Sequence, residues 1–436
     1  MKKIKIIGAG LAGCEAALQF AAKDWQVDLY EMRPEKQTEA HQSGYLAELV
    51  CSNSLKSKLP TTASGLLKQE LQLLGCQLLP IAEQCSVAAG NALAVDRDKF
   101  AQTVTELIEN HPNINLQRQE VTSLDDELTI VASGPLTSDG LTSALIKLVG
   151  AEHLYFFDAI APIVAADSLD YEIVYRKTRY DKGAADYLNC PFSKEEYYAF
   201  VEALQAADKH QAHEFENDFF ADIKFQFYEN CTPIEELARR GVDTLRYGVM
   251  RPVGLEDPKT ERRPYAVIQL RAENAESSSY NLVGCQTMLK YGEQKQILRM
   301  IPGLQKVEIL RYGSIHQNKY LNGPHILSAK LSLRQKDNIF IAGQLSGLEG
   351  YTESILGGLL SYKIIAENLT TLPQTTISGQ LWRHLITEQK NFQPMNANFG
   401  IVPALPERVR DKKLKKEKYS QRALKDLQKF LADQTS

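Results

Sequence analysis

Cys231 is the residue of this sequence best placed for nucleophilic chemistry. It directly precedes Thr232-Pro233-Ile234-Glu235, which predicts a helix start with Thr232 as N-cap, Pro233 in the first turn and Glu235 completing a capping box. The positive end of a helix dipole favours a thiolate, and two arginines later in the segment add to that effect, whereas two glutamates in the first turn oppose it. The pattern predicts a reactive thiol, and the alternative is a structural cysteine at a loop–helix junction.

Cys51 is the second candidate thiol. It stands among serine and asparagine in Val50-Cys51-Ser52-Asn53-Ser54, a setting that is unusual for a core position. The chain has seven cysteines with no C-x-x-C pair and no zinc-ligand spacing, namely Cys14, Cys51, Cys76, Cys85, Cys190, Cys231 and Cys285. We therefore predict no metal site and no disulfide framework, and the usual flavin disulfide reductases do not fit. A reducing, cytoplasmic location is expected.

A glycine turn near the start of the chain indicates dinucleotide binding. A strand over Lys3–Ile7 runs into the turn, a helix of small residues follows, and a second strand, Gln26–Glu31, ends in an acid. In such a turn the first glycine allows a tight bend, the second lets the backbone approach a pyrophosphate, and the third lets helix pack on strand. Glu31 stands where an acid bonds a ribose hydroxyl. The turn itself is Gly8-Ala9-Gly10-Leu11-Ala12-Gly13.

The fingerprint alone fits FAD and NAD equally, and a glycine-rich turn without a ligand is the alternative. The far end of the chain supplies further information. A buried strand over Asn338–Ile341 leads into Ala342-Gly343-Gln344, and Gly350-Tyr351 then precedes an apolar helix. The N-terminus of that helix is expected to point toward the cofactor. One fingerprint with a closing strand–turn–helix at the opposite end favours FAD over a simple NAD dehydrogenase.

We therefore predict an α/β fold whose FAD-binding Rossmann-type domain, like that of glutathione reductase, is split in sequence by an inserted α+β domain. The first part of the FAD-binding domain covers 1–158, the insertion covers 159–330, and the second part covers 331–436. From about residue 159 tyrosine and phenylalanine become frequent, charged residues alternate with them, and no second fingerprint occurs. The insertion is the expected substrate domain.

Composition limits the possible partners. The chain has 436 residues, 44% of them hydrophobic and 24% charged, with a net charge of −4. No run is long and apolar enough to span a membrane, and the first residues already form the nucleotide-binding strand, so no signal peptide and no membrane partner are expected. Any nucleic-acid site must be a local patch. The tail, Glu407–Phe430, holds ten Lys/Arg and four Asp/Glu, and it is either a solvated amphipathic helix or a phosphate-facing surface.

These motifs together resemble one family closely. The chain resembles the bacterial folate- and FAD-dependent tRNA (uracil-5-)-methyltransferases, the TrmFO family, over nearly its whole length. The resemblance rests on the glycine turn and on six further segments: Cys51-Ser52-Asn53-Ser54-Leu55, Cys231-Thr232-Pro233-Ile234-Glu235-Glu236, Tyr247-Gly248, Arg251-Pro252-Val253-Gly254-Leu255, Gln269-Leu270-Arg271, and Ala342-Gly343-Gln344 through Gly350-Tyr351-Thr352-Glu353-Ser354. Gln317 and Lys319 stand where the family is expected to have Arg and Thr.

The resemblance implies a reaction. 5,10-Methylenetetrahydrofolate donates one carbon, FAD carries it, NADPH or NADH supplies electrons, and C5 of the T-loop uridine at tRNA position 54 receives the methyl group. A thiolate must add to uracil C6 before C5 becomes nucleophilic. Carried over to this sequence, Cys231 is the nucleophile and Cys51 the second catalytic thiol, a candidate for the base, although their roles could be exchanged. The tRNA T-arm is the implied partner, DNA is not, and the RNA-binding residues expected are Arg251, Arg271, Lys412, Lys413, Lys415 and Lys416.

Three alternatives stay open at this point. The related flavoprotein family that modifies the wobble uridine of tRNA is longer and carries a helical C-terminal domain that this sequence lacks. A flavin oxidoreductase acting on a small molecule would not bind tRNA. A non-catalytic FAD-binding RNA chaperone would keep its function when a cysteine is replaced.

Overall fold

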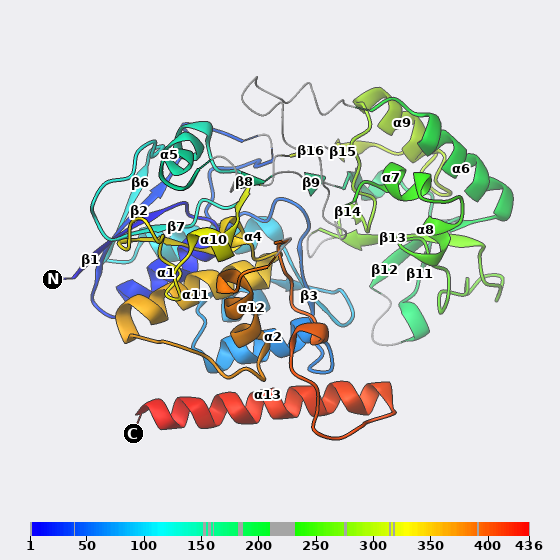
Figure 1. Cartoon of the computed structure of the whole chain (residues 1–436). Helices are drawn as coiled ribbons and strands as arrows, with labels where there is room; N and C mark the ends of the chain where they lie inside the picture. The colour runs from blue at the N-terminus through cyan, green and yellow to red at the C-terminus, as the bar shows by residue number, and fades with distance from the viewer. Residues whose placement is uncertain are drawn as a thin grey trace.

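The computed structural model describes residues 2–38, 40–150, 154–155, 158–159, 161–181, 186–209, 232–273, 277–313, 315–316, 319–389 and 392–435. They form two hydrophobic cores that lie side by side (Figure 1). The first core combines residues from both ends of the chain, and the second uses residues between Val164 and Val307.

A parallel sheet lies at the centre of the first core. Its strand order is β18–β7–β1–β2–β6, so a strand from the far end of the chain pairs beside strands from its beginning. The register sets Ile6 against Ile130 and Phe340 against Ile130. Apolar residues on both faces of strands β1, β7 and β18 are buried, as expected for a sheet covered by helices on each side. The strands are β1 (Lys3–Ile7), β2 (Gln26–Glu31), β6 (Ile114–Arg118), β7 (Thr129–Val131) and β18 (Ile339–Ile341).

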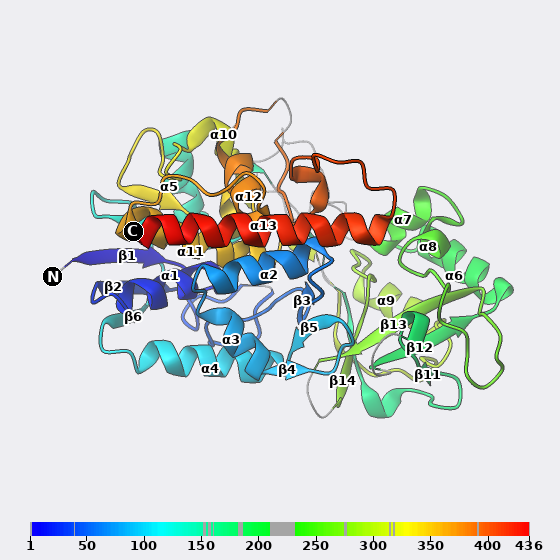
Figure 2. The same cartoon turned by 90° about the horizontal axis from the view of Figure 1, so that it is seen from below.

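The helices predicted after the glycine turn and at the closing segment are confirmed as α1 and α11. Helices α1 and α11 pack closely, because a Cβ added at Gly358 would lie 2.1 Å from the Ala12 carbonyl oxygen. The long helix α13 lies along α2 (Figure 2) and buries Tyr419, Ala423 and Leu427. The helices of this part are α1 (Leu11–Ala21), α2 (Ala63–Leu73), α3 (Leu78–Gln84), α4 (Arg97–Glu109), α5 (Asp139–Val149), α10 (Gly323–Ile326), α11 (Tyr351–Glu367), α12 (Ile377–Ile386) and α13 (Lys412–Thr435).

Short strands complete the first part of the molecule. A three-stranded sheet has the order β3–β5–β4, and two pairs, β9–β16 and β8–β17, join residues near 158 to residues near 320. They are β3 (Ser54–Ser57), β4 (Ser86–Val87), β5 (Ala92–Val95), β8 (Leu154–Tyr155), β9 (Asp158–Ala159), β16 (Ile315–His316) and β17 (Tyr320–Leu321).

The second core is built on an antiparallel sheet of order β11–β12–β13–β14–β10–β15. Helices α6, α7, α8 and α9 belong to this part of the molecule (Figure 1). The elements are β10 (Ile163–Ala165), β11 (Tyr175–Arg176), β12 (Tyr187–Phe192), β13 (Ala266–Ala272), β14 (Ser279–Leu282), β15 (Ile309–Arg311), α6 (Lys194–Ala206), α7 (Ile234–Arg239), α8 (Thr244–Tyr247) and α9 (Tyr291–Arg299). This sheet with its helices has the α+β character predicted for the insertion.

The end of the insertion differs from the sequence expectation. Tyr320, Leu321, Ile326 and Leu327 pack in the first core rather than in the second. We therefore propose that the insertion ends shortly before Tyr320 and not at residue 330. Within the described ranges, no helix combines the length and apolar character that a bilayer crossing requires.

Candidate cofactor and thiol site

The glycine turn between β1 and α1 has three glycines in three different environments. Gly8 has φ +100°, and a Cβ there would lie 2.5 Å from the Cα of Ser133. A Cβ at Gly13 would lie 1.8 Å from the carbonyl oxygen of Gly8. A Cβ at Gly10, by contrast, would have no heavy atom within 4 Å, and Gly10 faces an open pocket. The backbone at Gly10 is therefore accessible to a ligand, and the other two glycines are required by packing.

Glu31 ends β2 and forms part of the pocket wall. Its carboxylate accepts hydrogen bonds from the Ala9 N–H at 3.2 Å and from Arg33 Nε at 2.9 Å. Burial alone would raise the pKa of Glu31, but the Arg33 charge and its hydrogen bonds hold that pKa below its ordinary value. Arg33 also donates to Glu48 Oε2 at 3.1 Å. Glu31 is thus an ionised acid that still has acceptor capacity for a ribose hydroxyl.

The closing segment reaches the same pocket from the other end of the chain. Gly343 follows β18 with φ +70°, and a Cβ there would lie 2.8 Å from the Ala12 side chain. Gly350, at φ +125°, is the N-cap of α11. Tyr351 and Ser354 in the first turn of α11 line the pocket. The N-termini of α1 and α11 therefore both lie at one cavity, where their free N–H groups favour anionic groups.

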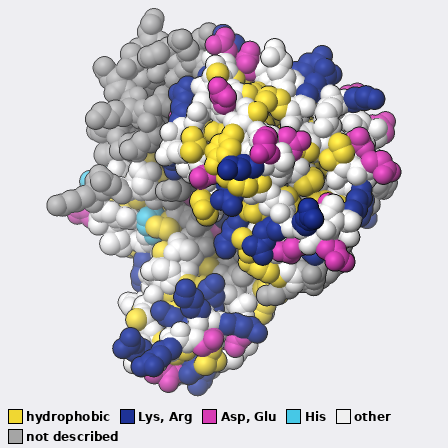
Figure 3. Space-filling model, turned by 90° about the vertical axis from the view of Figure 1, so that its right-hand side faces the viewer, with side chains coloured by type: hydrophobic (Ala, Val, Ile, Leu, Met, Phe, Trp, Pro, Cys, Tyr) yellow, Lys and Arg dark blue, Asp and Glu magenta, His cyan; other side chains and the backbone are white. Residues whose placement is uncertain are grey.

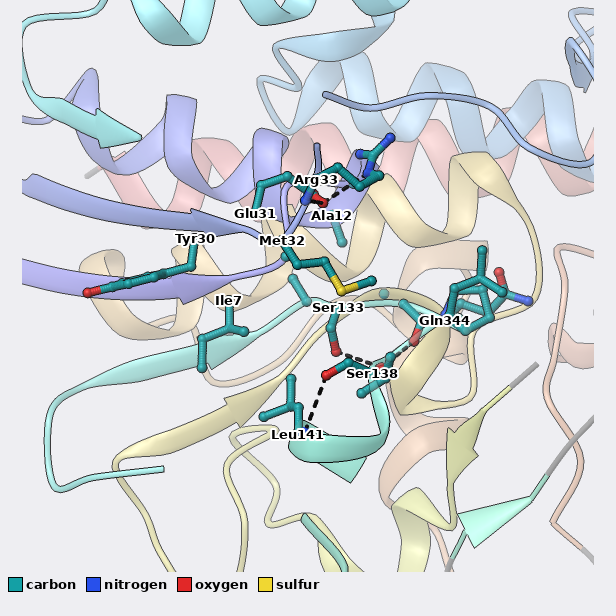
Figure 4. A pocket seen from close by; sticks show the side chains of 18 of the residues that line it. Ile7, Ala12, Tyr30, Glu31, Met32, Arg33, Ser133, Ser138, Leu141 and Gln344 are labelled. Atoms are coloured by element: carbon teal, nitrogen blue, oxygen red, sulfur yellow. Dashed lines mark hydrogen bonds and ion pairs between the residues drawn. The ribbon is translucent and has the colours of Figure 1, made fainter. Parts of the chain in front are cut away.

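Figure 4 shows the pocket that these elements surround. Three of the predicted cofactor residues do not line it: Ala9 bonds Glu31, Gly13 supports the turn, and Gly350 caps α11. The predicted residues that do line it are Gly8, Gly10, Leu11, Ala12, Glu31, Gly343, Gln344 and Tyr351. An exposed backbone turn, two helix N-termini and a ribose-type acid are the groups that an FAD molecule requires.

Several lining residues are not among the predicted site residues. The turn from Ser133 to Thr137, after β7, forms one wall and is closed by a 2.7 Å hydrogen bond between the hydroxyls of those two residues. Arg33 and His41 form another part of the wall. Burial and the nearby Arg33 lower the pKa of His41 to about 4, so this imidazole is neutral at pH 7. Arg33 stands only two positions after the predicted ribose-binding acid Glu31, and this closeness in sequence could have indicated that Arg33 belongs to the site. Nothing in the sequence near His41 indicates that it lines the pocket.

Cys51 lies beside this pocket, next to the first turn of α11. The backbone N–H groups of Cys51 and Ser52 donate to the Tyr351 hydroxyl at 2.9 and 3.0 Å. Arg97 donates to the carbonyl of Leu49 at 2.9 Å. Burial and Arg97 lower the pKa of Arg311, and Cys51 is also among the groups that act on it. Arg97 thus contacts the Cys51 loop, and Arg311 lies within electrostatic range of it.

Among the six cysteines that the structure describes, only Cys51 is not buried. Burial raises the pKa of four other thiols and keeps them protonated, namely Cys14, Cys76, Cys190 and Cys285. Cys76 and Cys85 lie in the first core. Cys51 is therefore the described thiol that is available for chemistry.

Cys231 lies outside the described residues, but the helix that follows it is described. Helix α7 begins at Ile234 with Pro233 as N-cap and without a side-chain cap. The predicted capping box is wrong, because Glu235 points into the second core. There it accepts hydrogen bonds from the Met288 N–H at 2.7 Å and the Thr287 hydroxyl at 3.0 Å. Burial raises the pKa of Glu235, and its carboxylate is directed to these two donors rather than to the helix start.

Comparison with known proteins decides the family. A family model described as glucose inhibited division protein A matches residues 3–372. A methylenetetrahydrofolate--tRNA-(uracil-5-)-methyltransferase TrmFO from Bacillus velezensis is 49% identical over 431 residues, covering 98% of each chain. The protein of the same name from Koribacter versatilis is 51% identical over 442 residues, covering 99% of this chain and 98% of its own. The chain belongs to the TrmFO family.

Solved structures agree with this fold. GidA from Aquifex aeolicus matches with a TM-score of 0.68 in one crystal form and 0.64 in another, at 13% and 14% sequence identity. The match covers 97% and 98% of this chain but 72% and 78% of the GidA chains. The likeness confirms the FAD-binding type of fold with an inserted domain, as predicted for this TrmFO-family member.

Lys319, one of the two positions at which this TrmFO-family chain departs from the expected pattern, is part of the wall structure. Its side chain is buried, and its ammonium donates to the Thr137 carbonyl at 2.7 Å and to Asp139 at 3.0 Å. The backbone N–H of Lys319 donates to the Pro135 carbonyl. Lys319 therefore supports the turn at one side of the pocket. Gln317 lies outside the described residues.

The loop that carries Cys51 is fixed to the insertion by Asn53. Its amide donates to the carbonyls of Val95 and Ala272 at 3.1 and 2.8 Å, and its oxygen accepts from Arg271 Nε at 2.7 Å. Both Asn53 and Arg271 are buried. Arg271, expected on the RNA surface, is thus placed in the contact between the two cores. A salt bridge of 2.5 Å between Arg97 and Glu273 lies beside it.

Replacing Asn53 with alanine is expected to lower the free energy of unfolding by about 3 kcal/mol, because three hydrogen bonds are lost and a buried guanidinium loses its acceptor. Urea unfolding measures this change. Asn115→Ala is the matched control, since Asn115 is exposed and its side-chain amide donates to Asp28 on the protein surface, and its change should stay within about 0.5 kcal/mol. Equal losses in both variants would contradict the role given to Asn53.

Proposed function

We propose that the chain is a cytoplasmic, FAD-dependent methylenetetrahydrofolate--tRNA-(uracil-5-)-methyltransferase that forms 5-methyluridine at T-loop position 54, with NADPH or NADH as reductant. One observation carries the proposal: a pocket with the features of a dinucleotide site lies against the Cys51 loop in a chain about half identical to TrmFO proteins over its whole length. The pocket supplies a cofactor site, and the thiol supplies a group for uracil chemistry.

The residues that would hold FAD follow from the pocket geometry. The backbone at Gly10 and the N-terminus of α1 would bind the pyrophosphate, and Glu31 would accept from a ribose hydroxyl. The N-terminus of α11, with Gly343, Gln344 and Tyr351 nearby, would lie against the ring system. Bound there, FAD supplies the redox chemistry that converts a folate one-carbon unit into a methyl group.

The two cysteines would act on the uracil. A thiolate adds to C6 and places negative charge on C5 and O4, so that C5 becomes a nucleophile for the one-carbon unit. A base then removes the C5 proton as the bond from the one-carbon unit to its carrier breaks. A hydride, derived from NAD(P)H, then adds to that carbon and completes the methyl group, and the thiol leaves as the C5–C6 double bond returns. We assign the addition to Cys231 and the second role, as base, to Cys51. The backbone contacts of Cys51 and Ser52 to Tyr351 hold the Cys51 loop at the cofactor pocket.

The tRNA surface is proposed to include Arg251 and the first turns of α13. Arg251 and the lysines at 412, 413, 415 and 416 are exposed. The opposite side of α13 is buried on the first core through Tyr419, Ala423 and Leu427. A helix anchored in this way presents its lysines outward at a fixed position, which suits contact with backbone phosphates.

Replacing Lys412, Lys413, Lys415 and Lys416 together with glutamine is expected to weaken tRNA binding at least tenfold. The slope of log affinity against log salt should fall by up to about 3 to 4, since each of four phosphate contacts contributes about 0.7 to 0.9. Binding titrations at several salt concentrations measure both quantities. The control is Lys425→Gln with Lys429→Gln, two exposed lysines nearer the end of the same helix. Unchanged affinity and slope in the fourfold variant would leave α13 as a solvated helix.

The function itself is tested by reconstitution. The purified protein should contain FAD and should methylate unmodified tRNA at C5 of the T-loop uridine only when both methylenetetrahydrofolate and NAD(P)H are present. Mapping the modified nucleotide separates the proposal from the wobble-uridine alternative. NAD(P)H oxidation without any tRNA product, or tRNA binding that survives with no methylation, would point instead to a small-molecule oxidoreductase or to an RNA chaperone.

A further inference from the structure

A second hollow lies on the insertion, away from the cofactor pocket. It has a volume of about 570 Å³ and is open to solvent. Its polar and aromatic lining consists of Arg246, Tyr247, Arg251, Arg263 and Tyr265, and two prolines and a valine complete it. The eight described lining residues include no acid. We call this site the arginine–tyrosine hollow.

Contacts within the hollow hold its arginine and tyrosine side chains in place and leave one aromatic ring exposed. Arg246 stacks on Tyr265, with its guanidinium carbon 4.1 Å from the ring centre, and lies 5.3 Å from the centre of the Tyr247 ring. Its Nε also donates to the Tyr265 carbonyl at 3.1 Å. Tyr265 is fixed from behind by a 2.9 Å hydrogen bond to the hydroxyl of Tyr198. Tyr247 remains 73% exposed, so one large aromatic face is open to solvent.

The arginine side chains of the hollow differ in whether they form an ion pair. Arg263 pairs with Glu256 at 3.1 Å, at the edge of the hollow. The exposed guanidinium of Arg251 has no ion pair or hydrogen bond among the described residues, although its carbonyl accepts from Arg179 at 3.0 Å. Arg179 in turn has its pKa lowered by burial and by Arg251, which shows that positive charge accumulates here. An open aromatic face beside an available guanidinium is the arrangement that binds a nucleobase together with its phosphate.

The position of the hollow indicates whether that nucleotide belongs to an RNA or to a small dinucleotide such as NAD(P)H. Strand β13 connects it to the Cys51 loop, because Tyr265 precedes the strand and Arg271 near its end bonds Asn53. Six residues of strand span roughly 20 Å. A hydride donor must touch the flavin directly, so a small dinucleotide anchored at this distance is poorly placed, whereas an RNA reaches both points at once. The face in Figure 3 carries lysine and arginine side chains over the insertion and, toward the bottom, where α13 begins.

We propose that the arginine–tyrosine hollow binds an unstacked nucleotide of the tRNA, remote from the uridine that is methylated, with its base on Tyr247 and its phosphate on Arg251. The proposal rests on the proposed function, since it takes tRNA as the substrate. It adds a second contact point that sets where the RNA lies relative to the catalytic thiols.

The test measures the affinity of the full-length, FAD-containing protein for an unmodified tRNA transcript at several salt concentrations. Tyr247→Ala should weaken binding about tenfold without changing the salt slope, and Tyr247→Phe should restore binding, because stacking needs only the ring. Arg251→Gln should lower the slope by roughly 0.7 to 0.9, the value of one phosphate. Tyr171→Ala and Arg299→Gln, at exposed positions of the same part of the molecule, are the matched controls.

The outcomes separate this inference from the proposed function. If the wild-type protein binds and methylates tRNA and the Tyr247→Ala variant binds tRNA with the same affinity, the inference about the hollow is wrong and the proposed function is unaffected. Slower flavin reduction by NADPH in Tyr247→Ala, with tRNA affinity unchanged, would assign the hollow to the hydride donor and also overturn the inference. Wild-type protein that does not bind tRNA overturns both.

Discussion

Cys231→Ala is expected to abolish methyl transfer to tRNA while the purified protein keeps its flavin. Without a thiolate at C6, uracil C5 remains a poor nucleophile, so the loss should exceed roughly a thousandfold in rate. The flavin is expected to stay because the described pocket is lined by other residues. The tRNA affinity should change little, since phosphate contacts dominate it. Single-turnover assays with flavin content and tRNA affinity measured on the same preparation test all three expectations.

A tRNA with 5-fluorouridine at the target position makes the prediction sharper. Fluorine cannot leave as a proton, so the covalent adduct should accumulate, and peptide mapping should place it on the segment that contains Cys231. Cys85→Ala is the control, because Cys85 is buried in the first core and should leave adduct formation near the wild-type level. An adduct on Cys51 would exchange the two assigned roles. No adduct from active wild-type protein would contradict nucleophilic catalysis by either thiol.

The elements that surround the glycine turn could be predicted because their signals are local. Strand, turn, helix, strand and acid follow one another within the first thirty-one residues, and the structure has β1, α1 and β2 in that order. The closing strand β18 is likewise predicted by a short apolar pattern that ends at a glycine. The sheet pairs β18 with β7, which brings both patterns to one pocket.

The capping box at Thr232 failed for a physical reason that the sequence does not contain. A glutamate at the third helical position normally caps its own helix, but Glu235 finds the Met288 N–H and the Thr287 hydroxyl in the core instead. Those partners are more than fifty residues away. A sequence window around the helix start cannot show such competition.

The surroundings of Cys51 were beyond the sequence for the same reason. Tyr351, which accepts from the backbone of Cys51, is 300 residues away, and Arg271 and Asn53, which bond each other, are 218 residues apart. Arginine is usually exposed, which favours a surface position for Arg271, yet its guanidinium is held in the contact between the two cores. Which polar residues are paired with each other is decided by the tertiary fold.

Gly10→Glu is expected to yield a folded protein without bound FAD. A side chain at this position meets open space, and the backbone has φ −74°, so a non-glycine residue is tolerated by the fold. The added carboxylate would lie where the pyrophosphate binds. Two like charges about 4 Å apart repel by about 4 kcal/mol near a protein surface, which corresponds to roughly a thousandfold loss of affinity. The ratio of flavin to protein absorbance after purification measures the effect, and circular dichroism reports the fold.

Three further variants distinguish charge at the site from damage to the turn. Gly10→Ala should fold and keep much of its FAD, because a methyl group there meets no atom within 4 Å. Gly292→Glu adds the same charge in open space on α9 and should leave FAD content unchanged. Gly13→Ala should destabilise the protein, because its Cβ would lie 1.8 Å from the Gly8 carbonyl oxygen. A full complement of FAD in folded Gly10→Glu would show that the pyrophosphate does not pass this turn, and the cofactor site would then have to lie elsewhere on the molecule.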